Sequence, residues 1–178
     1  MNLQPVLAAL DALGTSYALI GAHAMAVRGY PRFTIDVDLL TTDERVLTAA
    51  TWDVLRQSGA VVDARRGDAD DPLGGVVHIL LTDGTDVDVV LARWHWEARL
   101  IERADVVVLL GNPIRVPRIG DLILLKLAAG GYTELQDAAA LLAIGDTEAT
   151  IRDVDTHIDE VRPDIHALWR QLLAGRER

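Results

Sequence analysis

The stretch Thr34-Ile35-Asp36-Val37-Asp38-Leu39-Leu40 sets two aspartates two positions apart in an otherwise aliphatic run. This alternation is typical of a β-strand, on which successive side chains point to opposite faces of the sheet. We therefore expect Asp36 and Asp38 to share one face, about 6.6 Å apart along the strand. The opposite face, directed into a core, is expected to carry Ile35, Val37 and Leu39.

The spacing of the two carboxylates has an electrostatic consequence. Two negative charges held this close repel each other and lose hydration unless a cation binds between them. A hard divalent ion that prefers oxygen ligands, such as Mg2+, meets this requirement. The alternative is a solvated acidic edge on a half-buried strand, which is common for so short a motif. The neighbouring sequence favours the metal site.

An apolar run over residues 17–20 ends at Gly21 and is followed by a stretch compatible with a helix over residues 22–28. A strand, a tight glycine turn and a helix start direct backbone N–H groups toward an anion. Gly29 and Pro31 then end the helix before the aspartate strand. A phosphate cradle beside a carboxylate pair suits phosphoryl or nucleotidyl transfer, in which the protein mainly positions reactants and neutralises charge.

A third acidic element follows in residues 78–91, which the sequence predicts to be two strands joined by the hairpin dipeptide Asp83-Gly84. Asp86 and Asp88 share one face of the second strand. Asp86 is interpreted as part of the turn. Asp88 lies between two valines in the middle of the strand, and it is the third candidate metal ligand.

These motifs together resemble those of the nucleotidyltransferase superfamily with the polymerase-beta-like fold, in particular the group named after the abortive-infection toxin AbiEii. That superfamily has an hG[G/S] turn, a Dh[D/E]h strand and a third acidic residue on a later strand. Ile20-Gly21-Ala22 matches the turn in part, Asp36-Val37-Asp38-Leu39 matches the strand fully, and Val87-Asp88-Val89 matches the third element. The resemblance covers roughly residues 15–143.

The AbiEii-like group also carries a helix that resembles Pro117-Arg-Ile-Gly-Asp121-Leu-Ile-Leu-Leu-Lys126-Leu-Ala128 of this chain. A Lys-Asp-x-x-Asp stretch usually follows, whereas this chain has Thr133-Glu134-Leu-Gln-Asp137 and lacks the basic residue. From the residues alone, Asp121 is interpreted as a helix cap. Lys126 either extends from an apolar stripe to solvent or contacts phosphate.

The resemblance implies transfer of a nucleoside monophosphate from a nucleoside triphosphate to an acceptor hydroxyl, with release of pyrophosphate. Asp36 and Asp38 would hold Mg2+ (or Mn2+) on the triphosphate, and Asp88 would join a second metal and help deprotonate the acceptor. The expected nucleotide-binding residues are Gly21, Ala22, His23 and Lys126. His23 has an alternative role in capping or packing the helix start.

The acceptor stays open among a small molecule such as an antibiotic, a partner protein and transfer RNA. The resemblance also implies a toxin–antitoxin context with a cognate partner. The rival interpretation is a non-catalytic nucleotide-binding or partner-binding protein that keeps the fold. Ala22 and the missing basic residue before Glu134 favour that rival, and the retained acidic triplet argues against it.

Composition narrows these alternatives. The chain has 178 residues, no cysteine and a net charge of −10, from 27 acidic and 17 basic residues. Without cysteine, disulfides and thiolate metal sites are excluded, and a cytoplasmic location is expected. We find no apolar run long enough for a membrane span and no basic start typical of a signal peptide. The acidic balance argues against an RNA partner, although arginines at positions 28, 32, 65 and 66 leave room for a local basic patch.

The predicted architecture is α/β (α+β): a small mixed sheet with helices, followed by a C-terminal helical segment. We expect a nucleotidyltransferase-like core over residues 1–118 and a helical region over 119–178, packed on the core or forming one domain with it. Helices are predicted over residues 3–13, 43–58 and 94–103, and in about four segments after 119; strands are predicted over 16–20, 34–40, 59–64, 76–81, 86–91, 106–110 and 114–116. The helix over 43–58 is expected to start at an Asp43 cap and to bury Val46, Leu47, Ala50, Val54 and Leu55. The expected core anchors are Trp94, Trp96 and Trp169.

Overall fold

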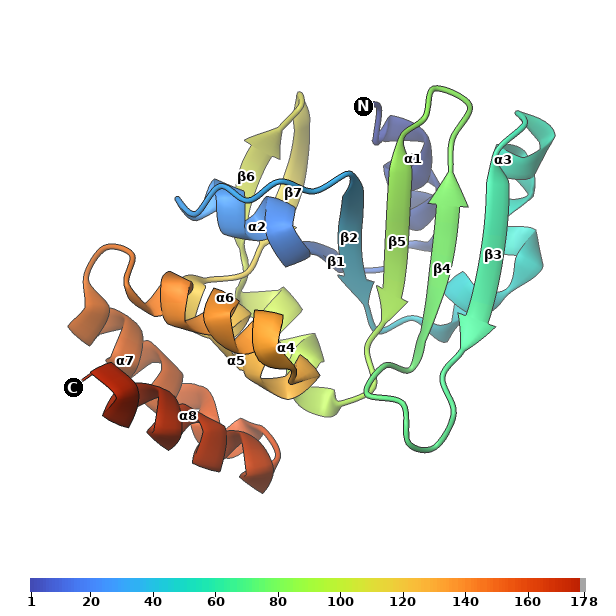
Figure 1. Ribbon diagram of the computed structural model, residues 1–178. Coiled ribbons are helices and arrows are strands. Elements are labelled where there is room, and N and C mark those ends of the chain that lie inside the picture. The colour runs from blue at the N-terminus through green and yellow to red at the C-terminus, as the bar shows by residue number, and fades with distance from the viewer. Residues whose placement is uncertain (177–178) are drawn as a thin grey trace.

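The computed structural model describes residues 1–176 and contains a five-stranded mixed sheet in the order β1-β2-β5-β4-β3 (Figure 1). Only the central pair, β2 and β5, is parallel; the other neighbours are antiparallel. The strands of this sheet are β1 (Tyr17–Ile20), β2 (Asp36–Thr41), β3 (Val61–Arg66), β4 (Gly75–Leu80) and β5 (Asp86–Leu91). A separate antiparallel hairpin consists of β6 (Asp105–Leu109) and β7 (Asn112–Val116).

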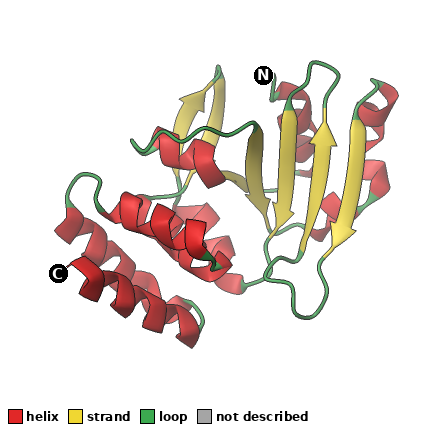
Figure 2. Cartoon of the chain, viewed as in Figure 1, coloured by secondary structure: helices red, strands yellow, loops and turns green. Residues whose placement is uncertain are grey.

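Helices lie behind the sheet and to one side of it, where the C-terminal part of the chain is helical (Figure 2). They are α1 (Gln4–Leu13), α2 (Gly21–Val27), α3 (Asp53–Gln57), α4 (His95–Arg103), α5 (Ile119–Ala129), α6 (Tyr132–Leu142), α7 (Thr147–His157) and α8 (Pro163–Arg176). Short 3-10 turns are η1 (Glu44–Leu47), η2 (Ala49–Trp52) and η3 (Ile158–Glu160). The predicted mixed sheet with C-terminal helices is confirmed. No helix within residues 1–176 is long and apolar enough to cross a membrane.

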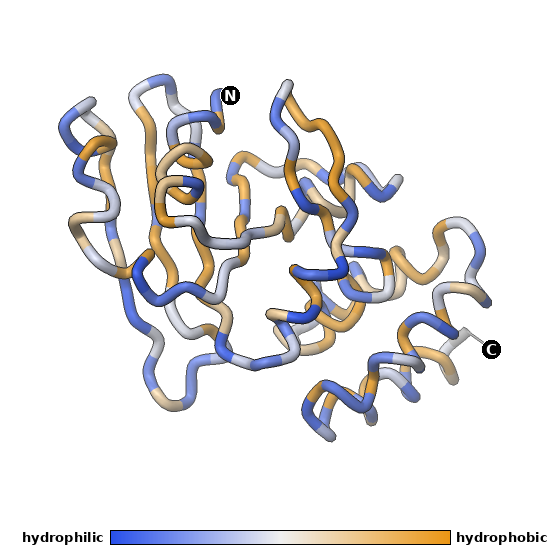
Figure 3. Tube along the Cα trace, turned by 180° about the vertical axis from the view of Figure 1, so that it is seen from behind, coloured by the Kyte–Doolittle hydropathy of each residue, from blue (hydrophilic) through white to orange (hydrophobic). Residues whose placement is uncertain are grey.

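One face of the sheet packs against the main hydrophobic core, and α1, α3, η1 and η2 cover this face (Figure 1). Its alternate positions on the three central strands are completely buried: Val37, Leu39, Val77, Ile79, Val87 and Val89. Figure 3 shows that the strands are mostly hydrophobic, whereas several of the connecting loops are hydrophilic. The aspartates therefore lie on the opposite face, as the alternation predicted.

The hairpin between β4 and β5 fixes which residues of these strands lie side by side. Its turn is closed by a hydrogen bond of 2.8 Å from the Leu81 N–H to the Thr85 carbonyl. Gly84 takes φ of +82°, a conformation that favours glycine. The resulting register sets His78 opposite Asp88.

The predicted helix over residues 43–58 is wrong. Asp43 does cap a turn, by accepting a hydrogen bond of 2.9 Å from the Arg45 N–H, but the chain then forms two 3-10 turns and only a short α3. Thr48 is extended, with φ −82° and ψ 128°, so it interrupts the helix. The Trp52 indole donates a hydrogen bond of 2.7 Å to the Val46 carbonyl, and burial of this pair dictates the irregular path.

Other predicted core positions are also corrected. Of the predicted inner side of the 43–58 segment, Val54 is 77% exposed, and Ala50 is exposed as well. Ile35 is 67% exposed, because the strand begins at Asp36 rather than at Thr34. Trp96 and Trp169 are buried as expected, whereas Trp94 lies at the surface.

Candidate active site

The three predicted acidic residues lie together on the face of the sheet opposite the main core. Asp36 and Asp38 project from β2, and Asp88 projects from the parallel neighbour β5. The strand register sets Asp38 directly beside Asp88. One carboxylate oxygen from each of the three residues lies within 4.8 Å of the others. This donor set suits a hard divalent cation.

The three carboxylates differ in their electrostatic surroundings. The Thr34 hydroxyl donates a hydrogen bond to Asp36, which lowers the pKa of that carboxyl. Asp38 is half-buried and lies between the other two charges. Burial first, and then the charges of Asp36 and Asp88, raise the pKa of Asp38 to about 6. A cation bound at this point would relieve both unfavourable effects.

Gly21 allows the chain to pass directly beside Asp38. Its φ of +64° lies in the left-handed region, and a Cβ at this position would come within 1.9 Å of the Asp38 Oδ2. The glycine is thus required by two independent constraints, conformation and close approach. Ala22, which stands where the hG[G/S] turn motif has glycine or serine, is buried.

His23 lies close enough to Asp36 for its charge to contribute to the lowered pKa of that carboxyl. Its Nε2 is buried and forms no hydrogen bond with any residue in 1–176. The helix that His23 belongs to, α2, has only seven residues.

Two cations beside the carboxylates are held by one buried aspartate. Lys126 Nζ lies 2.7 Å from Asp137 Oδ2, and Arg32 Nη1 lies 2.5 Å from the same oxygen. Asp137 is on α6, Lys126 on α5, and Arg32 on the loop before β2. Charges on Lys126 and Arg32 lower the pKa of Asp38, against the larger effect of burial. Sequence reasoning did not identify Arg32 as part of this site.

A pocket of about 390 Å3 opens beside Asp38 and Gly21, between the sheet and α5. Most of its walls are apolar, and they include Leu40, Leu73, Val90, Leu122 and Leu125. Trp94 lines it at the surface, where the guanidinium groups of Arg93 and Arg162 lie 5.8 and 5.3 Å from the ring centre. The pocket is large enough for a small organic group next to the carboxylates.

Asp121 does not cap a helix, contrary to the prediction. The side chain is 1% exposed and accepts a hydrogen bond of 2.9 Å from Arg103 Nε. Arg103 Nη1 also lies 3.2 Å from Glu160 Oε2. This network joins α4, α5 and η3 and lies outside the carboxylate cluster. The residues of this network are distant from one another in the sequence, so no local motif predicted it.

The four arginines suggested for a basic patch are each paired with a carboxylate. Arg28 pairs with Asp105 at 2.9 Å, Arg65 with Asp63 at 2.7 Å, and Arg66 with Glu44 at 3.3 Å. Arg32 pairs with Asp137, as described above.

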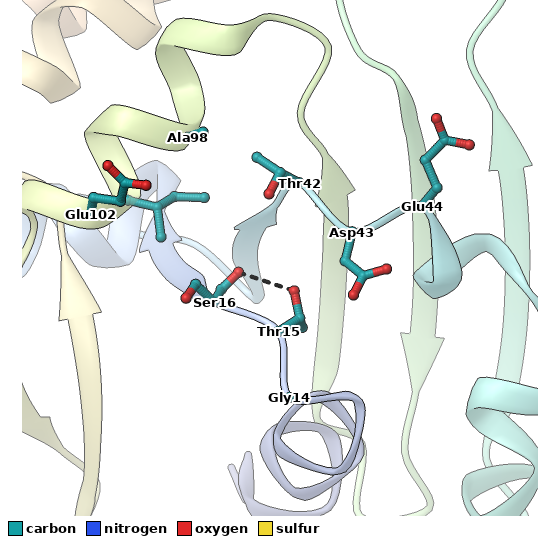
Figure 4. Close-up of a pocket in the computed structure, with 9 residues that line it drawn as sticks. Gly14, Thr15, Ser16, Thr42, Asp43, Glu44, Ala98 and Glu102 are labelled. Carbon is teal, nitrogen blue, oxygen red and sulfur yellow. Dashed lines mark hydrogen bonds between the residues drawn. The ribbon is translucent and has the colours of Figure 1, made fainter.

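A second hollow, of about 460 Å3, lies at the opposite end of β2 (Figure 4). It is lined by Thr15, Ser16, Thr42 and Asp43 and by residues of α4. Within it, the Thr15 hydroxyl donates to the Ser16 carbonyl at 3.5 Å. Asp43 is already engaged by Arg45. Because none of the three converging aspartates lines this hollow, we assign it no role.

No protein-family model and no curated protein sequence matches this chain. Among solved structures, the solution structure of the antibiotic-resistance factor ANT(2'')-Ia aligns with a TM-score of 0.54 and 18% identity, over 98% of this chain and 92% of that chain. The crystal structure of ANT(2'')-Ia in complex with adenylyl-2''-tobramycin aligns with a TM-score of 0.50 and 18% identity, over 88% and 96%. The chain has a nucleotidyltransferase fold. At this identity the likeness establishes the fold alone, so the chemistry must be argued from side chains.

Proposed function

We propose that this protein transfers a nucleoside monophosphate from a nucleoside triphosphate to the hydroxyl group of a small molecule. The observation that carries the proposal is the convergence of Asp36, Asp38 and Asp88 around a point bordered by Gly21. Asp38, in the middle of this group, lacks a compensating partner, and a partly buried charge of this kind is costly to the folded protein and typical of functional sites. The nucleotidyltransferase fold supports this assignment.

The residues present fit a divalent cation. Three carboxylate oxygens within 4.8 Å of one another form an all-oxygen donor set, which suits Mg2+ or Mn2+. Burial, and then repulsion from Asp36 and Asp88, raise the pKa of Asp38, and a bound cation would oppose both effects. When bound, the metal would neutralise charge on the triphosphate and on the reacting oxygens.

The protein's own groups bind and orient the nucleotide. Asp36 and Asp38 would hold the metal that accompanies the triphosphate. Gly21 lets the Asp38 carboxylate lie directly against the backbone of the turn, because Asp38 Oδ2 occupies the place that a Cβ would take, and we assign no role to the dipole of the short α2. Lys126 and Arg32, positioned by Asp137, would pair with phosphate oxygens.

The proposed reaction is a displacement at the α-phosphorus. The acceptor oxygen forms a bond to this phosphorus, while the bond from the α-phosphorus to the bridging oxygen breaks. Pyrophosphate leaves with the electron pair of the broken bond. Asp88 accepts the proton of the acceptor hydroxyl, and because it belongs to a different strand from Asp36 and Asp38, it can act on the acceptor while they hold the nucleotide.

A small-molecule acceptor is favoured over RNA. The largely apolar pocket of about 390 Å3 beside Asp38 suits an organic group. An RNA acceptor requires several cations free to contact phosphates, whereas the chain carries a net charge of −10 and its Arg28, Arg65 and Arg66 are paired with carboxylates. Membership in the AbiEii-like group, with a cognate toxin or antitoxin partner, remains a proposal based on the motif around Asp121 and Lys126.

The experiment incubates the protein with each labelled nucleoside triphosphate, Mg2+ and a cell extract, and then searches for the labelled species. Asp88→Asn should lower turnover by about 10²–10⁴-fold, because it removes the proton acceptor, and leave nucleotide affinity almost unchanged. Asp70→Asn, in the exposed loop before β4, is the matched control and should transfer label normally. Nucleotide binding without transfer in the wild type would support the non-catalytic rival instead.

A further inference from the structure

His78 lies next to the acidic cluster on the neighbouring strand β4. The registers of three adjacent strands place Asp38, Asp88 and His78 in one row across the sheet. His78 Nδ1 lies 2.9 Å from Asp88 Oδ1, within hydrogen-bond distance. Neither the Asp-x-Asp motif nor the third acidic motif includes this residue.

The chemistry of the pair fixes the direction of this hydrogen bond. An ionised carboxylate only accepts hydrogen bonds, so the His78 Nδ1 carries the hydrogen and donates it. The hydrogen bond to Asp88 raises the pKa of His78. Asp86 Oδ1 lies 3.3 Å from the same nitrogen but forms no hydrogen bond within residues 1–176. The imidazole is therefore directed to Asp88.

The three carboxylates of the site are not supported in the same way. Asp36 accepts a hydrogen bond from Thr34, and Asp88 accepts one from His78. Asp38, in the middle, accepts none from the residues that the structure describes. Each outer carboxylate thus has one dedicated donor, which restricts rotation of the carboxyl group and leaves oxygen lone pairs available to a ligand.

We propose that His78 is a positioning residue that holds Asp88 in the orientation needed to bind the cation and receive the acceptor proton. This proposal rests on the proposed function, since it assigns His78 a role through Asp88. Packing against neighbouring side chains does not fix the orientation of the Asp88 carboxyl group, because the β3–β4 part of this sheet face is exposed. Val61 and Leu80 are open to solvent, and the His78 side chain is 46% exposed.

The contribution of the His78–Asp88 pair to stability is expected to be small. Exposed ion pairs typically contribute about 0–1 kcal/mol to the free energy of unfolding. By contrast, loss of a group that orients a metal ligand typically lowers metal affinity or activity about 10–100-fold. The two roles are separable, because the first predicts a small stability change and no effect on the site.

The test is Mn2+ binding to the full chain, measured by electron paramagnetic resonance for the wild type, His78→Phe, His78→Asn and Asp38→Asn. The amide N–H of asparagine replaces the Nδ1 donor, whereas phenylalanine has no donor. We expect His78→Phe to weaken Mn2+ binding about 10–100-fold and His78→Asn to stay within about threefold of the wild type. His95→Phe, which changes a histidine outside the site, is the matched control and should bind Mn2+ as the wild type does.

The outcomes separate this inference from the proposed function. Binding that depends on Asp38 but is unchanged in His78→Phe overturns the role of His78 and leaves the metal site intact. Equal loss in His78→Phe and His78→Asn also overturns it, as does a directly bound imidazole nitrogen in the pulsed spectrum, because His78 would then be a ligand. Absence of Asp38-dependent Mn2+ binding in the wild type overturns both proposals.

Discussion

Two aspartates in this molecule, Asp121 and Asp38, have lost much of their hydration, but only Asp121 has a cationic partner within the protein. Asp121, between α4 and α5, is 1% exposed and accepts hydrogen bonds from two nitrogens of Arg103, Nε at 2.9 Å and Nη2. Asp38, on β2, accepts no hydrogen bond from any residue in 1–176. Its neighbours are two further carboxylates, and the closest cations, Lys126 and Arg32, are already bound to Asp137.

Burial raises the pKa of both residues, so burial alone does not distinguish a structural charge from a functional one. The difference is the partner. At Asp121 the protein provides the compensating cation itself, and the charge contributes to the packing of the C-terminal helices. At Asp38 compensation is incomplete, so the site has electrostatic affinity for a ligand cation. The predictions below test this contrast, beginning with the largest effect.

Removing the cation from the compensated aspartate should be strongly destabilising. Arg103→Met leaves Asp121 buried without its partner and should lower the free energy of unfolding by about 3–5 kcal/mol. Urea denaturation followed by circular dichroism measures this change. Arg99→Met is the control: Arg99 is largely exposed and lies 3.8 Å from Glu160, so its replacement should have almost no effect. Similar stability of the two variants would show that Asp121 does not depend on Arg103.

At the uncompensated aspartate, removing the charge should stabilise the metal-free protein. The folded pKa of Asp38, about 6, lies above its ordinary value, so its contribution to stability is present below pH 4 and is lost as the pH rises through 6. In EDTA, Asp38→Asn should therefore exceed the wild type by about 2–3 kcal/mol at pH 8 and match it at pH 4.

Asp36→Asn is the matched comparison for that experiment. The pKa of Asp36 is lowered by Thr34, so its ionised form is favoured in the folded state and its replacement should not stabilise the protein at pH 8. Thermal unfolding at pH 4, 6 and 8 measures both variants. A gain in Asp36→Asn equal to that in Asp38→Asn would refute the proposed asymmetry within the cluster.

The smallest expected effect concerns the cations that are shared with Asp137. Lys126→Met removes one phosphate contact but leaves Arg32 in place, so we expect nucleoside triphosphate affinity to fall about tenfold, or 1.4 kcal/mol. Calorimetric titration with nucleotide and Mg2+ measures it. Arg65→Met, which removes an exposed arginine paired with Asp63, is the control. Unchanged affinity in Lys126→Met would exclude Lys126 from the phosphate site.

The site was more predictable from sequence than the compensated network because its signals are local. Alternation over residues 34–40 places Asp36 and Asp38 on one face whatever the rest of the chain does. The position of His78 beside Asp88 was not predictable in this way, because a two-residue Asp83-Gly84 loop would set Asp88 opposite Ile79, whereas the observed turn is one residue longer and sets it opposite His78. The Arg103–Asp121 contact carries no such signal, because it depends on how two helices pack.

The irregular segment after β2 shows a second reason why structure could not be predicted from the sequence. Residues 43–58 have an acceptable helical pattern, but burial of Trp52 against the Val46 carbonyl overrides it. Fold class, strand order along the chain and the final helices followed from hydrophobic periodicity and glycine or proline positions. The pairing partners Asp137 for Lys126 and Asp105 for Arg28 became visible only in three dimensions.

The central claim is that Asp38 is left uncompensated in order to bind a cation together with a nucleotide. The most direct test is the increase in melting temperature caused by Mg2+ plus each nucleoside triphosphate, in the wild type, Asp38→Asn and the control Asp70→Asn. Ligand at about 100 times its dissociation constant should stabilise the wild type and Asp70→Asn by about 2.7 kcal/mol. Asp38→Asn should be folded and show no such increase. An equal increase in Asp38→Asn, or none in the wild type with any nucleotide, would contradict the account.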